Sequence, residues 1–322
     1  MTLCYHAERD RANLHEAADI LKQGGTVVFP TETVYGLGAN GLDEAAVRKI
    51  FIAKGRPADN PLILHIASLD WLDRLVVDVP PITQTLIDAF WPGPLTLILR
   101  RRDFVPDIVT AGLDTVAIRM PSHPLARAII AAADLPIAAP SANLSGKPSP
   151  TKADHVIADM MGRVDLIIDG GDVEHGLEST VLDLSVEPPL ILRPGAITYE
   201  QLRAFCPTVQ LDKSLLVSFG KDKPRAPGMK YRHYAPRAAV FVVDLAHSSQ
   251  EIDALIQSFT EKGHKVRYID ESAERLAGQL FSLFRSADAD GYDVILVKAV
   301  PTDQIGLAVM NRLLKAAEYK II

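Results

Sequence analysis

The sequence predicts a two-domain α/β protein, in which a large domain with a mixed sheet precedes a small Rossmann-like αβ domain. Short β-branched runs alternate with helical patterns through the first two-thirds of the chain, which is typical of an α/β domain. A proline-rich and almost wholly basic stretch at residues 221–237 then interrupts the alternation. A second, shorter alternation follows. We therefore predict domains at residues 1–206 and 238–322, joined by an extended linker at 207–237.

The strands of the large domain are predicted from runs of β-branched and aliphatic residues. Residues 44–53 form a predicted helix, because Val47, Ile50 and Phe51 fall on one face and Asp43 precedes them as a cap. Two further segments, 123–133 and 198–205, also have helical patterns, and the mixture of elements favours a mixed sheet. The predicted strands are residues 26–29, 62–66, 95–99, 116–119, 166–169, 181–184 and 190–192.

The small domain is predicted from the same two patterns in regular alternation. No GxGxxG motif follows its first strand, so the sequence gives no reason to assign it a dinucleotide. Its predicted elements are a strand at 239–243, a helix at 250–262, a strand at 265–269, a helix around 274–284, a strand at 294–297 and a helix at 306–317.

The composition limits the classes of function that the chain can have. Its 322 residues suit two domains, and 48% hydrophobic with 23% charged residues is normal for a packed globular protein. The formal net charge of −6 argues against binding nucleic acid by bulk charge, so any polyanion must meet a local basic pocket. Two distant cysteines, Cys4 and Cys206, cannot form a disulfide framework or a thiolate zinc site. The sequence shows no signal-peptide core and no membrane-length apolar run, which predicts a cytoplasmic location.

The first candidate functional segment is FPTETVYGLG at residues 29–38. A predicted strand ends here and is followed by hydroxyl side chains, among them Thr33, and by two glycines. Strand ends in α/β sheets are where ligands bind, and hydroxyls at such an end can hold an amino acid or a phosphate. A tight turn with exposed threonines is an equal alternative on the residues alone.

The second candidate segment follows the helix at 44–53. Lys54 and Arg56 flank Gly55, and Asn60 and His65 come shortly after. Because Lys54 and Arg56 follow a helix end, both are expected to be solvent-accessible. A flexible lysine and a forked arginine suit a polyphosphate, since one supplies a point charge and the other paired hydrogen bonds. Gly55 could also simply end the helix, and the two roles are compatible. A Walker loop is absent from the sequence, so a nucleotide would have to be held in another way.

The third candidate segment is PSANLSGKPS at residues 140–149, in which Ser141 and Asn143 share a face if the chain is extended. Its composition alone favours a surface loop. Three polar residues beside other strands complete the set: Arg119 and Arg193 each end an apolar run, and Ser179 precedes one. Arginines at strand ends are commonly ion-paired or exposed. Three such polar positions in one predicted domain favour a shared anion site only modestly.

Taken together and in order, these strings resemble the threonylcarbamoyl-AMP synthase family. They are FPTETVYGLGAN, AKGRPADNPLILHI, TVAIRMP, PSANLSGKPSPT, GLESTVLDL and LRPGAIT, and PGMKYRHYAP followed by a small αβ unit is similar to the two-domain form of that family. The resemblance covers nearly the whole chain. It implies an α/β domain with a deep, concave basic cleft and a reaction that joins L-threonine, bicarbonate or CO2, and ATP into threonylcarbamoyl-AMP and pyrophosphate.

The resemblance also implies a role for each matched residue. It places Thr33, His65, Arg119, Ala139 and Ser179 around threonine, and it leaves open whether Tyr234 or His233 contacts ATP. Lys54, Arg56, Ser141 and Asn143 become the candidates for catalysis by positioning and charge. The residues expected to hold ATP are Arg56, Asn60, Thr115, Ser141, Ser149, Arg193 and Tyr234.

The same resemblance implies the partners of the reaction. Magnesium is expected to arrive with ATP and to be held mainly by the phosphates, with no metal ligand from the protein side chains. A separate transferase complex is expected to pass the threonylcarbamoyl group to tRNA, and direct contact with tRNA to be weak at most. The segment at 221–237 is expected to fold over the cleft as a lid that shields a labile intermediate from water, with a solvated tether as the alternative on the residues alone. An RNA-binding protein, or a carbamoyl-transfer protein with a related module, is the alternative.

Overall fold

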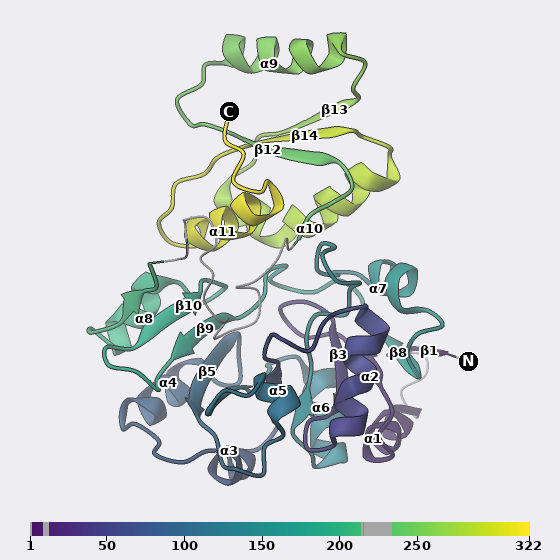
Figure 1. Ribbon diagram of the computed structural model, residues 1–322, viewed down its shortest axis with the longest axis vertical. Helices are drawn as coiled ribbons and strands as arrows, with labels where there is room; N and C mark the ends of the chain where they lie inside the picture. The colour runs from purple at the N-terminus through teal and green to yellow at the C-terminus, as the bar shows by residue number, and fades with distance from the viewer. Residues whose placement is uncertain (1, 9–12, 214, 216–233) are drawn as a thin grey trace.

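Two lobes make up the protein in the computed structural model, which describes residues 2–8, 13–213, 215 and 234–322. Within these residues, the larger lobe contains an 11-stranded mixed sheet and the smaller lobe a three-stranded parallel sheet with its helices (Figure 1). The predicted fold class is therefore confirmed. The domain boundaries stay predictions, and most of the segment predicted as a linker and lid lies outside the described residues.

The large sheet runs in the order β1-β8-β2-β3-β7-β4-β6-β5-β9-β10-β11. Parallel and antiparallel pairs alternate irregularly: β4 is parallel to β6, β6 is antiparallel to β5, and β5 is parallel to β9. The strands are β1 (Leu3–His6), β2 (Val27–Phe29), β3 (Gly36–Asn40), β4 (Ile63–His65), β5 (Leu95–Arg100), β6 (Thr115–Arg119), β7 (Ile137–Ala138), β8 (Leu166–Asp169), β9 (Thr180–Asp183), β10 (Leu190–Arg193) and β11 (Gln210–Leu211).

The helices of the large domain cover this sheet, and α2 shows how local sequence defines them. The Asp43 carboxylate accepts hydrogen bonds from two backbone amides of the first turn, and Gly55 ends the helix with a φ of 60°. Both capping predictions are confirmed. The helices are α1 (Leu14–Lys22), α2 (Glu44–Lys54), α3 (Leu69–Leu75), α4 (Ile82–Phe90), α5 (Asp107–Thr110), α6 (Pro124–Ala133), α7 (Ala153–Met160) and α8 (Tyr199–Phe205).

The small domain has the predicted Rossmann-like succession. Its sheet has the order β12 (Ala239–Val243), β14 (Val294–Lys298), β13 (Val266–Ile269), with both pairs parallel. Helix α9 (Ser249–Glu261) lies on the outer side of the sheet, whereas α10 (Ala273–Ala289) and α11 (Gly306–Ala316) lie between the sheet and the large domain (Figure 1). Helix α10 extends further than predicted, to Ala289.

The two domains share a hydrophobic cluster. Val34 and Leu177 of the large domain belong to the same group of buried residues as Phe281 of α10 and Met310 of α11. This packing fixes the inner helices of the small domain against the strand ends of the large domain. No helix in the described part of the chain is long and apolar enough to cross a membrane.

Candidate functional site

A cavity that is partly open to solvent lies over the short central strands of the large sheet. It receives residues from both ends of β4 and from the ends of β6, β7, β9 and β10. The predicted site residues that line it are Thr33, Arg56, His65, Arg119, Ala139, Ser141, Asn143, Ser149, Ser179, Arg193 and Tyr234.

Strand register explains why residues far apart in sequence meet in this cavity. His65 pairs with Arg119 across the parallel β4–β6 ladder. The start of β9 lies at the same edge, because β5 is antiparallel to β6 and parallel to β9. β10 then returns antiparallel to β9 and places Arg193 opposite Val181, beside Ser179. The sheet therefore brings two arginines, one histidine and the Ser179 hydroxyl to one edge.

One end of the cavity is built around Arg119, which is almost completely buried. Its Nη1 donates to Thr33 Oγ1 at 3.0 Å, and its Nη2 lies 2.7 Å from Glu32 Oε1. Burial alone would raise the pKa of Glu32, but the Arg119 guanidinium lowers it to about 2, so this carboxylate is ionised at neutral pH. A fixed cation beside a threonine hydroxyl is a suitable site for a small amino-acid carboxylate.

His65 adds a neutral imidazole to this end. Its ring Nδ1 lies 3.3 Å from the carbonyl oxygen of Ile63. Burial and then the nearby Arg119 lower the pKa of His65 to about 3, so the ring carries no charge at neutral pH. It can therefore donate or accept a hydrogen bond without adding a second cation next to Arg119.

The other end of the cavity combines cations with short hydroxyl and amide side chains. Arg56 donates from Nη2 to the Asn60 carbonyl at 3.0 Å. Arg193 donates from Nε to the Ser179 carbonyl at 3.0 Å and from Nη2 to Ser179 Oγ at 3.1 Å. Because these contacts fix both guanidinium groups in advance, the site is preorganised for an oxyanion.

The loop at 140–149 is folded by its own side chains. Ser141 Oγ donates to Asn143 Oδ1 at 2.5 Å, and Asn143 Nδ2 donates to the carbonyls of Leu144 and Lys147. The expectation that Ser141 and Asn143 share a face agrees with their direct contact. The segment is only in part a surface loop, because Asn143 and Ser149 are buried whereas Ser145 and Lys147 are exposed.

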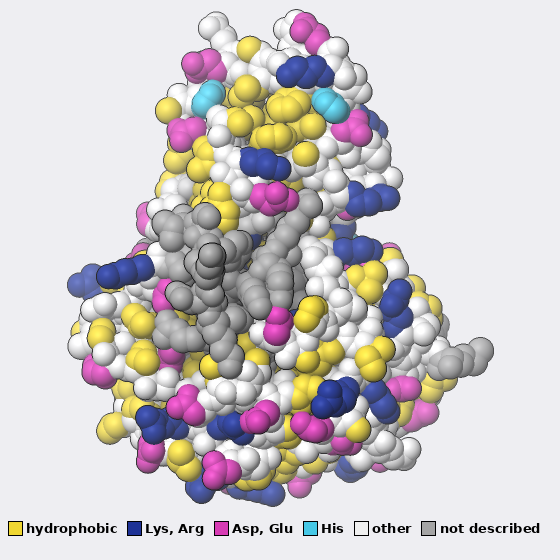
Figure 2. Space-filling model, viewed as in Figure 1, with side chains coloured by type: hydrophobic (Ala, Val, Ile, Leu, Met, Phe, Trp, Pro, Cys, Tyr) yellow, Lys and Arg dark blue, Asp and Glu magenta, His cyan; other side chains and the backbone are white. Residues whose placement is uncertain are grey.

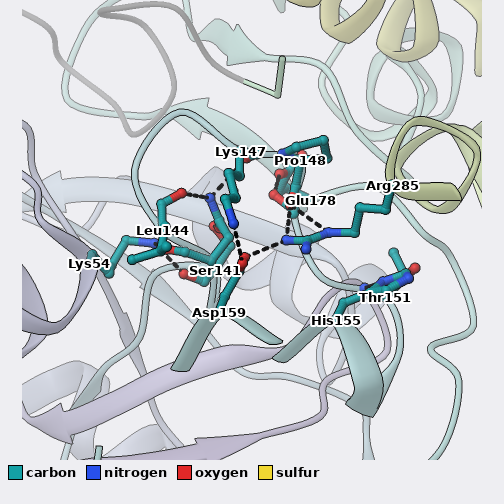
Figure 3. A network of polar contacts seen from close by, with 12 residues as sticks. Lys54, Ser141, Leu144, Lys147, Pro148, Thr151, His155, Asp159, Glu178 and Arg285 are labelled. Carbon is teal, nitrogen blue, oxygen red and sulfur yellow. Dashed lines mark hydrogen bonds and ion pairs between the residues drawn. The ribbon is translucent and has the colours of Figure 1, made fainter. Parts of the chain in front are cut away.

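Lys54 supports the same loop from below and does not line the cavity. It is the last residue of α2, only 3% exposed, and its Nζ donates to the backbone carbonyls of Ser141 and Asn143 (Figure 3). Burial and then the neighbouring Arg56 keep its pKa well below the usual range. The expectation of a solvent-accessible lysine after the helix end is wrong, because the loop at 141–143 covers it.

Asn60 and Thr115 also lie outside the cavity lining. The backbone carbonyl of Asn60 accepts from Arg56, so this residue is placed to orient an arginine of the site. Thr115 begins β6 opposite Arg100, at the other end of the strand from Arg119. Their roles toward ATP stay predictions.

Three cavity residues with polar side chains were not among those predicted from the sequence: Thr31, Lys147 and Glu178. Thr31 Oγ1 lies 2.9 Å from Thr33 Oγ1. Glu178 accepts from Ser149 Oγ at 2.5 Å, and its pKa, which burial would raise, is lowered by Arg312 and Arg193. Glu178 adjoins Ser179 in the string GLESTVLDL, which was the one sequence signal for it.

Tyr234 reaches the cavity with support from the small domain. Its ring is stacked on Phe281 of α10 with 5.2 Å between centroids, and the Arg312 guanidinium lies 5.8 Å from the Tyr234 ring centroid. Between the two expected candidates, Tyr234 lines the cavity and His233 lies outside the described residues.

Charge on the outer surface is not organised into a nucleic-acid platform on the face drawn in Figure 2. Among the described residues on that face, Lys and Arg side chains are interspersed with Asp and Glu side chains and form no broad basic patch. Within the described residues, no group of three His, Cys, Asp or Glu side chains is arranged to hold a metal ion. The arrangement favours a small anionic ligand within the cavity.

Comparisons with known proteins show which family this chain resembles over its whole length. Residues 19–195 match the family model described as "Telomere recombination", and residues 197–318 match the model described as "Threonylcarbamoyl-AMP synthase, C-terminal domain". The threonylcarbamoyl-AMP synthase of Pyrococcus abyssi is 49% identical over 95% of this chain and 94% of that protein. The protein of the same name from Bacillus subtilis is 47% identical over 95% of this chain and 93% of that protein.

A solved structure is equally similar over its full length. The crystal structure of P. abyssi Sua5 complexed with L-threonine superimposes with a TM-score of 0.95 at 46% identity, covering 100% of this chain and 99% of that one. The similarity therefore includes both domains and their arrangement.

Proposed function

The chain belongs to the threonylcarbamoyl-AMP synthase family, and from this we propose that its cavity binds L-threonine at the Arg119 end and ATP at the Arg56 and Arg193 end. The observation that carries the proposal is the presence of two differently built ends in one cavity. One offers a single buried cation with a neutral imidazole and a hydroxyl. The other offers two fixed guanidinium groups with Ser141 and Ser149.

The threonine end matches the chemistry of an amino acid. Arg119 would pair with the threonine carboxylate, and Thr33 and Ser179 would supply hydroxyl partners at short range. Neutral His65 leaves the threonine amine free of repulsion from a second positive charge. In support, the similar P. abyssi protein was crystallised with L-threonine.

The reaction needs no protein nucleophile. The threonine amine adds to CO2 and loses a proton, which gives an N-carboxylate. One oxygen of this carboxylate forms a bond to the α-phosphorus of ATP, and the bond between that phosphorus and the bridging oxygen breaks. Pyrophosphate departs with the electron pair, leaving threonylcarbamoyl-AMP. The task of Arg56, Arg193 and Ser141 would be to align the triphosphate and stabilise its charge.

Magnesium would enter with ATP and remain on the phosphates. The described carboxylate in the cavity, Glu178, is engaged with Ser149 and Arg312, which is consistent with a phosphate-bound ion. We further propose that the adenylate passes to a separate tRNA-modifying transferase. The cytoplasmic location also stays a prediction.

The proposal is tested by mass spectrometry of the products from threonine, ¹³C-bicarbonate and ATP. The expected products are a labelled threonylcarbamoyl adenylate and pyrophosphate, formed only when all three substrates are present. Release of ADP and orthophosphate would contradict it. Salt-dependent binding of tRNA without ATP would instead favour the RNA-binding alternative.

A further inference from the structure

One arginine of the small domain contacts the part of the large domain that forms the phosphate end of the cavity. Arg312 of α11 has no exposed surface. Its Nε donates to Glu178 Oε2 at 3.1 Å, and its Nη1 donates to the carbonyl of Pro194. Glu178 precedes Ser179, and Pro194 follows Arg193. Arg312 therefore holds the two segments that carry these cavity residues.

Glu178 is the link from Arg312 to the cavity. This carboxylate lines the cavity itself and also accepts from Ser149 Oγ. A buried carboxylate next to a site for a triphosphate would repel the ligand if its charge were not balanced. Arg312 is not among the residues that form the cavity wall. It supplies a buried positive charge that balances the Glu178 carboxylate from outside the cavity.

We infer that Arg312 is a positioning residue for the nucleotide site, acting through Glu178: it neutralises this carboxylate and holds it in place for Ser149. The inference rests on the proposed binding of ATP at this end of the cavity. It assigns to the small domain a direct part in building the nucleotide site. Arg312 is not a catalytic residue, because it acts on the ligand through another side chain.

A second interdomain arginine provides a matched control. Arg285 of α10 donates to the Pro148 carbonyl and pairs with Asp159 at 2.7 Å (Figure 3). Like Arg312 it joins the two domains by an ion pair, here with Arg285 12% exposed and Asp159 buried, but neither of these two contacts involves Glu178. A general loss of docking should therefore affect both variants alike, whereas the proposed role should separate them.

The test measures steady-state KM values for ATP and threonine in the full-length protein. Arg312→Met is expected to raise the KM for ATP by about tenfold or more and the KM for threonine by a smaller factor, since the segment that Arg312 holds also carries Ser179. Adding Glu178→Gln to Arg312→Met removes the unbalanced charge, so the double variant should recover most of the affinity for ATP. Glu178→Gln is not expected to rescue Arg285→Met.

The outcomes are distinguishable. Equal KM values for ATP in wild type and folded Arg312→Met would overturn the inference, as would failure of Glu178→Gln to restore ATP affinity. If Arg312→Met does not fold, the same KM measurements are made on Arg312→Lys instead. One ammonium cannot reproduce both guanidinium contacts, so the KM for ATP should still rise severalfold, and a wild-type value would overturn the inference. If the wild type itself makes no adenylate, the proposed function fails instead.

Discussion

Glu32 and Arg119 form a buried ion pair with 2.7 Å between Oε1 and Nη2, and both side chains are less than 5% exposed. The same guanidinium contacts Thr33 through Nη1. Glu32 thus balances the charge of Arg119 when the cavity holds no substrate. Threonine would bring a second carboxylate to the same guanidinium, which makes the stability of this pair sensitive to the ligand.

We predict that Glu32→Gln lowers the free energy of unfolding by about 3 kcal/mol, because it leaves a buried cation without its partner. Saturating threonine should raise the melting temperature more in this variant than in the wild type, since the substrate carboxylate replaces the missing charge. Urea denaturation and thermal melts with and without threonine measure both effects. The control is Glu44→Gln, whose exposed pair with Arg48 should contribute no more than about 0.5 kcal/mol. Wild-type stability of Glu32→Gln would contradict the prediction.

Lys54→Met should destabilise the protein and reduce activity together. Its ammonium holds two backbone carbonyls of the loop at 141–143, and each buried carbonyl left unpaired costs about 1–3 kcal/mol. The expected result is a lower urea midpoint and faster hydrogen exchange in this loop. Lys49→Met, which removes a single contact with the Gly24 carbonyl, is the matched control. An unchanged midpoint with lost activity would instead point to direct contact between Lys54 and substrate.

Arg56→Ala should separate activity from stability. Arg56 is half-buried and lines the cavity, so its loss removes little core packing. Loss of a charge-assisted contact to phosphate should cost about 2–4 kcal/mol of transition-state stabilisation. The check is kcat/KM for ATP beside a thermal melt. A folded variant with near-normal kcat/KM would exclude a phosphate role for Arg56.

Lys315 of α11 should make stability depend on pH. Burial, and then Arg312 and Arg193, lower its pKa to about 7, with Glu178 acting in the opposite direction. Between pH 7 and the ordinary lysine pKa, the unfolded chain binds the proton that the folded chain has released. The contribution of Lys315 to stability therefore rises as the pH increases from about 7 to about 9.

This prediction is checked by measuring the free energy of unfolding in urea at pH values from about 7 to about 9. Lys315→Met should flatten the rise, because neither state of the variant then titrates at this position. The half-exposed Lys320 serves as the control, and Lys320→Met should retain the wild-type slope. Identical slopes for wild type and Lys315→Met would show that the ammonium is solvated in the folded protein.

Sequence patterns predicted the elements whose residues carry their own signals. β12 has the predicted limits, and α2 differs from the prediction only at its last residue, because β-branched runs and a helix with caps at both ends are local features. Four strands of the large sheet, β1, β3, β7 and β11, were missed. β3 has the sequence GLGAN and β7 has two residues, so neither has much strand propensity, and both exist through pairing with neighbours.

The site was predicted least well where partners are distant in sequence. Lys54 was expected at the surface because the loop that covers it lies 87 residues further along the chain. Glu178 could not be assigned a role without Arg312, which is 134 residues away. Such contacts follow from the register of the sheet and the docking of α11, which no short motif contains.

The strand order of the large sheet has a consequence for how the chain folds. Some neighbouring strands are far apart in the sequence. β5 lies between β6 and β9, and Leu95 of β5 is opposite Thr180 of β9. In the same way β1 pairs with β8, with Leu3 opposite Leu166. Until residues near 180 join the sheet, one edge of β5 is open to pairing with another molecule. Pairings over such long separations are slow to form. Recovery of native protein after dilution from denaturant should therefore fall as protein concentration rises, since closing the sheet competes with association between chains.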